Sequence, residues 1–99
     1  MAYEILVGLN VLDEDLYTQY RMAMKPFLTS FGGGFGYDFT IAEVLSSEVT
    51  EKINRVFTIN FPNKKGMESF FSNEEYLKIK EQFFIKSVGN TTIISSYEK

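Results

Sequence analysis

Hydrophobic residues recur along the chain with two different periods, and each period predicts a type of element. Residues 3–12, 35–45 and 55–61 alternate between apolar and more polar positions, as a strand with one buried face does. Residues 91–98 form a last segment of strand-forming residues. The sequence therefore predicts four strands.

Helical spacing follows the first predicted strand. Asp13 can cap a helix whose apolar positions, from Leu16 to Phe31, fall at three- and four-residue intervals. Pro26 lies inside this stretch, where we expect it to kink the helix or to end its regular part. The glycines at 32–34 should then stop the helix.

A second helical region follows the third predicted strand. Asn63 can cap a short helix that carries three large apolar residues. The segment that begins at Ser72 fits a capping box, with Ser72 at the cap and Glu75 three residues later. A longer helix should therefore begin here and run to about Val88, and Gly89-Asn90 should end it.

The resulting order of elements is β-α-β-β-α-β, with no linker, and it predicts a single domain over residues 1–99. With right-handed crossovers this order gives an α+β fold, the ferredoxin-like sandwich. In that fold a four-stranded antiparallel sheet carries two helices on one face. The opposite face is then left without a helical layer.

The uncovered face of the predicted sheet is more apolar than the surface of a monomer should be. The apolar residues that alternation places there are Leu6, Ala42, Val44, Val56 and Ile94. A patch of this extent usually marks an interface. We therefore expect a homodimer that packs sheet face to sheet face around a two-fold axis. The alternative is a monomer whose last strand folds differently.

Charge and hydropathy limit the classes of partner that the protein is expected to bind. The 99 residues include 13 acidic and 10 basic side chains, for a formal net charge of −3. This balance argues against nucleic acid, which needs a basic face for its phosphates. No apolar run approaches the ~20 residues of a membrane-spanning helix, and no signal peptide is visible. We expect a cytoplasmic protein without a membrane partner.

The sequence contains no Cys and no His, which excludes several kinds of chemistry. Disulfides, thiolate nucleophiles, the Ser-His-Asp triad and the usual ligands of zinc and haem are all absent. The acids at 13–15 lack the spacing of a calcium loop and are typical of a solvated helix start. The glycine-rich run at 32–36 follows a helix instead of preceding one, so it does not fit a phosphate loop. We expect neither a metal nor a cofactor.

Ten Phe and six Tyr occur without a single Trp. Large rings help a small chain to bury enough apolar area, so a core role is favoured over an aromatic-lined pocket.

Several short motifs, in order along nearly the whole chain, carry a family resemblance. They are Ala2-Tyr3, Tyr17 with Tyr20-Arg21, Gly32-Gly33, Phe61-Pro62, and the run from Phe70 to Tyr76 that continues to Ile79-Lys80. In this ordered set the chain resembles the DUF1330 family, small proteins of the dimeric α/β-barrel superfamily. The resemblance implies the dimeric barrel fold and leaves the activity undefined. Its superfamily includes cofactor-free monooxygenases, lactone isomerases and haem enzymes, and in several of its enzymes the pocket lies between helices and sheet.

Small polar residues form the first candidate site. Strand alternation places them together on the less apolar face: Asn10, Asp38, Thr40, Thr58 and Asn60. Because the first strand lies between the third and fourth in this fold, they can cluster around a small ligand. Asp38 is the only acid among them and the candidate general base, although pairing with Arg55 is the commoner role. The competing interpretation is a hydrated centre of the dimer interface.

Tyr37, next to Asp38 in the sequence, should point to the opposite face, toward the helices, where its hydroxyl can donate to a ligand oxygen.

Two tyrosines and an arginine form the second candidate site. Tyr20, Arg21 and Tyr76 come from the two helices and can bind a carboxylate or a quinone-like oxygen. The simpler interpretation is tyrosines at the edge of the core with their hydroxyls in water.

Two functions from different classes follow. The first is a DUF1330-like protein that binds a small molecule in or beside the barrel, without demonstrated catalysis. The second is a cofactor-independent monooxygenase or isomerase that acts on a small aromatic or lactone substrate. An enzyme should show a closed pocket that holds a perturbed acid or tyrosine. The absence of His, Cys and Trp favours the first function.

Overall fold

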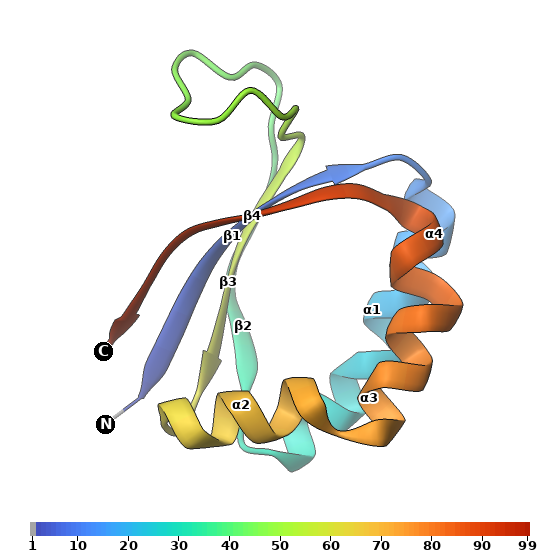
Figure 1. The fold of residues 1–99 in the computed structure, drawn as a ribbon, viewed down its shortest axis with the longest axis vertical. Helices are drawn as coiled ribbons and strands as arrows, with labels where there is room; N and C mark the ends of the chain where they lie inside the picture. The colour runs from blue at the N-terminus through green and yellow to red at the C-terminus, as the bar shows by residue number, and fades with distance from the viewer. Residues whose placement is uncertain (1) are drawn as a thin grey trace.

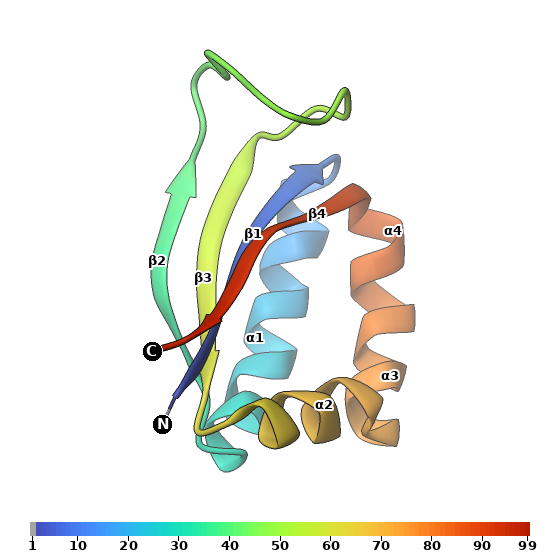
Figure 2. The same ribbon diagram turned by 60° about the vertical axis from the view of Figure 1, so that its left-hand side comes forward.

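The computed structural model describes residues 2–99. Its four strands form one antiparallel sheet in the order β2-β3-β1-β4 (Figure 2). They are β1 (Tyr3–Val11), β2 (Gly34–Thr40), β3 (Arg55–Phe61) and β4 (Val88–Glu98). The predicted α+β, ferredoxin-like arrangement, with the first strand between the third and fourth, is confirmed.

Helical segments cover one face of this sheet and leave the other bare (Figure 1). They are α1 (Glu14–Ser30), α2 (Lys64–Ser72), α3 (Glu74–Ile79), the π-helical turn η1 (Lys80–Phe84) and α4 (Ile85–Ser87). The last three follow one another as a single helical rod beside α1, and α2 crosses one end of the sheet (Figure 1). The loop between β2 and β3 projects beyond the other end.

Side-chain caps start the helices. The Asp13 carboxylate accepts the Leu16 amide at 3.0 Å and the Asn63 side chain accepts the Gly66 amide at 2.7 Å, which confirms both predicted caps. The predicted capping box is wrong by one residue. Ser72 is the last residue of α2, and Asn73 caps α3 by accepting the Glu75 amide at 2.9 Å. Both side chains suit a cap, and the turn between the two helices selects the second.

Pro26 does not end α1, which continues to Ser30. A proline inside a helix removes one backbone hydrogen bond, and here the buried side of the helix outweighs that loss. That side consists of Tyr17, Tyr20, Met24 and Leu28.

The sequence predicted that Gly89-Asn90 ends the second helical region, but that region ends earlier, at Ser87. β4 already begins at Val88, and Asn90 pairs with Asn10 of β1. Gly89 is the extra residue at a register shift next to that pair. Pairing with β1 therefore determines the conformation of this segment and overrides its local tendency to form a turn.

The core lies between the sheet and the helices. Alternate residues of β1 and β3 form its floor: Ile5, Val7, Leu9, Val11, Phe57, Ile59 and Phe61. The helices contribute Tyr17, Met24 and Leu28 from α1 and Phe70 from α2, each 1% exposed or less. The Phe70 ring lies 4.6 Å from that of Tyr76 and 5.6 Å from that of Phe61, so aromatic packing holds α2 against both α3 and the sheet.

Candidate functional site

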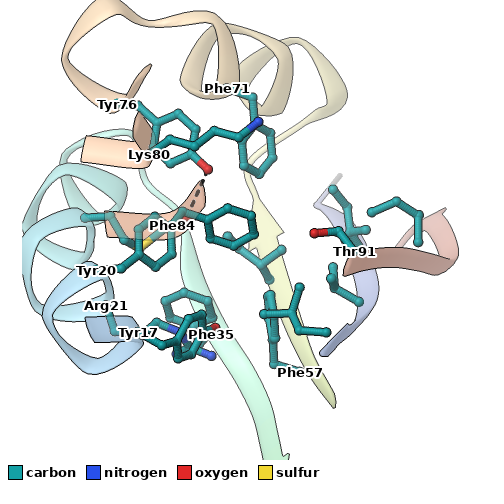
Figure 3. A pocket seen from close by; sticks show the side chains of 16 residues that line it. Tyr17, Tyr20, Arg21, Phe35, Phe57, Phe71, Tyr76, Lys80, Phe84 and Thr91 are labelled. Atoms are coloured by element: carbon teal, nitrogen blue, oxygen red, sulfur yellow. Dashed lines mark hydrogen bonds between the residues drawn. The ribbon is translucent and has the colours of Figure 1, made fainter. Parts of the chain in front are cut away.

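A cavity of about 220 Å³ lies within this core, between the sheet and the helices (Figure 3). Strands β1 and β3 supply an apolar floor, and α1, α3 and η1 supply the opposite wall. An engineered apolar cavity of about 150 Å³ is enough to hold benzene. A ligand with one ring or a short chain therefore fits this space.

The cavity opens beside β4, which is an edge strand. Two of its lining residues, Thr91 and Ile93, belong to that strand, and Ile93 is 56% exposed. The lining residues on α1 are far less accessible, since Tyr17 and Met24 are 1% exposed or less. A ligand would therefore enter between β4 and the helical rod.

Tyr20 and Tyr76 form a hydrogen-bonded pair in the cavity wall. Their hydroxyl oxygens are 2.9 Å apart and buried. Burial raises the pKa of both phenols, so both are neutral at physiological pH. The bond between them uses only one of their two hydroxyl hydrogens. The other can be donated in a hydrogen bond to a ligand oxygen.

Arg21 lies at one end of the cavity, beside Tyr17 and Phe35 (Figure 3). Its guanidinium carbon lies 3.8 Å from the centre of the Phe35 ring, and its Nε donates to the Tyr17 hydroxyl at 2.9 Å. Its Nη2 is 3.2 Å from a carboxylate oxygen of Asp38. That contact is an ion pair without hydrogen-bond alignment, so Nη2 is buried without a hydrogen-bond partner among residues 2–99.

A β-bulge brings Asp38 to this end of the cavity. Gly36 and Tyr37 of β2 both lie opposite Thr58, because Phe35 pairs with Ile59 and Asp38 with Phe57. The Tyr37 amide donates to the Thr58 hydroxyl at 2.7 Å, which anchors the extra residue. A bulge interrupts the alternation of side chains. The predicted face of Asp38 is therefore wrong: its carboxylate lies on the helix side of the sheet.

Arg55 holds the Asp38 carboxylate through two hydrogen bonds, each 2.8 Å long. The predicted pairing of these two residues is confirmed. The Arg55 bonds, aided by the nearby Arg21 charge, keep the pKa of Asp38 below its usual range. Arg55 also lies 3.5 Å from the Glu14 carboxylate at the start of α1. This network supports Arg21 and contains no free base, which argues against Asp38 as a general base.

Tyr37 points away from the helices, contrary to the prediction. It is 66% exposed, and its ring stacks on that of Phe39, with centroids 5.8 Å apart, on the uncovered side. The same bulge is the cause, since it moves Tyr37 and the strand residues after it to the face opposite to the predicted one.

The predicted polar cluster on the strands is only partly assembled. Thr58 and Asn60 lie on the uncovered face, where they pair with Leu6 and Glu4 of β1. Asn10 lies toward the other end of β1, where its side-chain oxygen is 3.5 Å from the Asn54 amide nitrogen. Thr40 pairs with Arg55 and so faces the helices, like Asp38. These residues do not form one site.

Glu4 is a buried acid on the uncovered face that the sequence analysis missed. It is 5% exposed, accepts a hydrogen bond from the Tyr97 hydroxyl, and lies 3.2 Å from the Lys99 ammonium. The Tyr97 bond, with help from Lys99, lowers the pKa of Glu4. This arrangement joins the two chain ends and leaves Glu4 ionised.

Lys80 and Phe84 also line the cavity and were likewise missed. With Tyr76 they recur every fourth residue along the second helical region, a spacing that does identify one helix face. Within residues 2–99 no group of three or more acids is placed to hold a metal ion. None of the helices in the described part of the chain combines the length and hydropathy needed to cross a membrane.

The chain is similar in structure to several solved proteins. A protein of unknown function from Rhodopseudomonas palustris matches with a TM-score of 0.80 and 14% identity, over 99% of this chain and 82% of that one. A DABB family protein with a ferredoxin-like fold from Mesorhizobium loti gives 0.68 and 11%, over 99% and 96%. A dimeric ferredoxin-like protein of unknown function from Bacteroides fragilis gives 0.65 and 9%, over 99% and 96%. These likenesses establish the fold.

No curated protein matches the chain in sequence. The family model of a domain of unknown function, DUF1330, matches residues 1–97. The match covers the tyrosines, the arginine and the lysine of the cavity together with β1, β2, β3 and all but the last residue of β4. This chain belongs to the DUF1330 family.

Proposed function

We propose that this protein binds a small molecule that has an apolar body and an anionic oxygen, in the cavity between sheet and helices. The observation that carries the proposal is the buried Nη2 of Arg21, which has no hydrogen-bond partner among residues 2–99. The Asp38 carboxylate, 3.2 Å away, offsets the charge of Arg21 but is not aligned for a hydrogen bond, so this donor stays unused. A carboxylate or enolate oxygen that reaches the Arg21 guanidinium from the cavity adds a charge-assisted bond there.

The charges of the cavity lining support an acid as the ligand. The lining includes two basic side chains, Arg21 and Lys80, and no acidic one. Most of the remaining surface is aliphatic or aromatic, which suits a ring or a short chain. The second hydroxyl hydrogen of the Tyr20 and Tyr76 pair adds one directional hydrogen-bond donor. Catalysis by a cofactor-independent monooxygenase or isomerase stays a prediction.

Calorimetric titration with benzoate tests the proposal. Benzoate should bind the wild-type protein, and R21M should weaken it about tenfold or more, the usual effect of losing a charge-assisted bond. K25M is the matched control, because Lys25 is an exposed lysine one turn further along α1. Circular dichroism should show that both variants fold. Failure of benzoate to bind, or equal binding by R21M, contradicts the proposal.

We infer further that two copies associate through the uncovered sheet face. Support comes from its exposed aromatic pair, Tyr37 at 66% and Phe39 at 53%, and from the dimeric relative of the same fold. Light scattering after size exclusion should give a dimer for the wild type and a monomer for F39D. L77D is the control, since Leu77 is 43% exposed on α3, on the helix side. A monomeric wild type contradicts this interface.

A further inference from the structure

We propose that Lys80 is a second anion anchor at the opposite end of the same cavity from Arg21. The ligand class then becomes narrower: molecules with an acidic group at each end and an apolar middle. This inference rests on the proposed function, because it concerns the same cavity. It adds a specificity-determining residue that the tyrosine and arginine cluster does not include.

The position of Lys80 supports this role. It is half-buried, lines the cavity, and lies beside Phe71 and Tyr76 (Figure 3). The ion pairs found within residues 2–99 involve Arg21, Arg55 and Lys99 but not Lys80. Lys80 is therefore a cation that lines an apolar space without a carboxylate of its own chain to neutralise it.

The backbone of the helical rod keeps Lys80 over the cavity. The Ile85 amide donates to the Lys80 carbonyl, a bond that spans five residues and defines a π-turn. In an α-helix of 3.6 residues per turn, positions four apart drift steadily around the axis. The wider turn offsets that drift, so Tyr76, Lys80 and Phe84 all line the cavity. Such turns occur frequently at functional sites.

The two cations lie at separate ends, with apolar surface between them. Figure 3 shows Arg21 grouped with Tyr17 and Phe35 at one end, and Lys80 grouped with Tyr76 at the other. The Phe84 ring lies between these groups and packs 4.9 Å from the ring of Tyr20. A molecule that fills this space meets a positive charge at each end. A second carboxylate on the ligand is thus matched, whereas a second apolar end would desolvate Lys80 without compensation.

The two cations also differ in a useful way. Arg21 is fixed by its ring contacts and by Asp38, so it defines one position for a planar carboxylate. Lys80 has a flexible apolar stem and a compact charge, so its ammonium can follow ligands of different length. We therefore expect Lys80 to favour diacids over monoacids while it accepts a range of spacings between the two acidic groups.

Matched pairs of ligands test the inference by calorimetric titration at constant salt. The pairs are benzoate with terephthalate, hexanoate with adipate, and octanoate with suberate. In the wild type, the best diacid should bind about tenfold more tightly than its monoacid, the effect of one added charge-assisted contact. K80M keeps a stem of similar length and should lower the affinity for each diacid to that for its monoacid, so that the preference disappears. K78M, an exposed lysine of α3 outside the cavity lining, should retain the preference.

The outcomes separate this inference from the proposed function. Monoacids that bind as tightly as diacids in the wild type overturn the second anchor and leave the proposed function standing. A diacid preference that persists in K80M overturns the role of Lys80. If no acid of either kind binds the folded wild-type protein, both proposals are overturned. A preference that is lost in K80M, and kept in K78M, supports the assignment.

Discussion

The hydroxyl oxygens of Tyr20 and Tyr76 meet at 2.9 Å, although 56 positions separate the two residues in the sequence. The bond joins α1 to α3 in the cavity wall, and both side chains are at most 5% exposed. Two hydroxyls that satisfy each other are stable in an apolar wall, whereas one alone is not. The pair thus links the two helices and also offers a hydroxyl donor to a ligand.

Removing one hydroxyl of this pair should cost more than removing both. Y20F and Y76F each keep the ring but leave a buried partner unsatisfied, so each should lower the free energy of unfolding by about 1–3 kcal/mol. The double variant should lose less than either single variant. Urea denaturation of all four proteins measures the coupling. Additive losses would contradict the pairing, and Y3F outside the pair serves as control.

The buried phenols should make the fold sensitive to alkali. Burial raises the pKa of Tyr17, Tyr20 and Tyr76 above the ordinary value, so these groups keep their protons in the native state. Above about pH 10 the unfolded chain releases those protons first, and the free energy of unfolding falls as pH rises. The tyrosinate absorbance of these residues should appear only together with loss of near-ultraviolet circular dichroism. Y20F/Y76F should reduce its amplitude, and ionisation within an intact fold would contradict the burial.

Asp38 should make the fold sensitive to acid. Its hydrogen bonds from Arg55 lower its pKa in the native state, so its stabilising contribution is complete above the unfolded value and is lost as pH falls through the folded value. Glu4 acts in the same direction through Tyr97. D38N should therefore lose less free energy of unfolding than the wild type between about pH 6 and about pH 2. E81Q, at an exposed acid of the helical rod, is the control and should lose as much free energy of unfolding as the wild type. An equal loss in D38N and the wild type would show that this network contributes nothing.

Local signals along the sequence predicted most of the fold. Strand β3 was placed at its observed bounds, and Asp13 and Asn63 were identified as caps because a cap depends on residues within one turn. Tyr20 and Tyr76 were grouped correctly, since their helices pack on the same face of the sheet.

Features that depend on distant residues were not predictable in this way. The bulge that moves Asp38 to the helix side is anchored by the Thr58 hydroxyl on the neighbouring strand, and alternation along β2 alone contains no sign of it. The π-turn that positions Lys80 likewise leaves no hydrophobic signature of its own. As a result the sequence grouped the tyrosines correctly and misplaced the acid beside them.

The bulge should depend on the absence of a side chain at Gly36. A Cβ there would lie 2.5 Å from the Thr58 Oγ1, the same oxygen that accepts the Tyr37 amide. G36A should therefore push the hydroxyl away and cost about 1–3 kcal/mol of unfolding free energy, as overpacking does. It should also weaken benzoate binding, because the shifted strand moves Asp38 away from Arg21. At Gly34 the nearest atom would be 3.8 Å away, so G34A is the control for the loss of a strand glycine. In a T58A background the clash disappears, and G36A should cost less there than in the wild type. Equal costs in both backgrounds would show that the Thr58 contact does not hold the bulge.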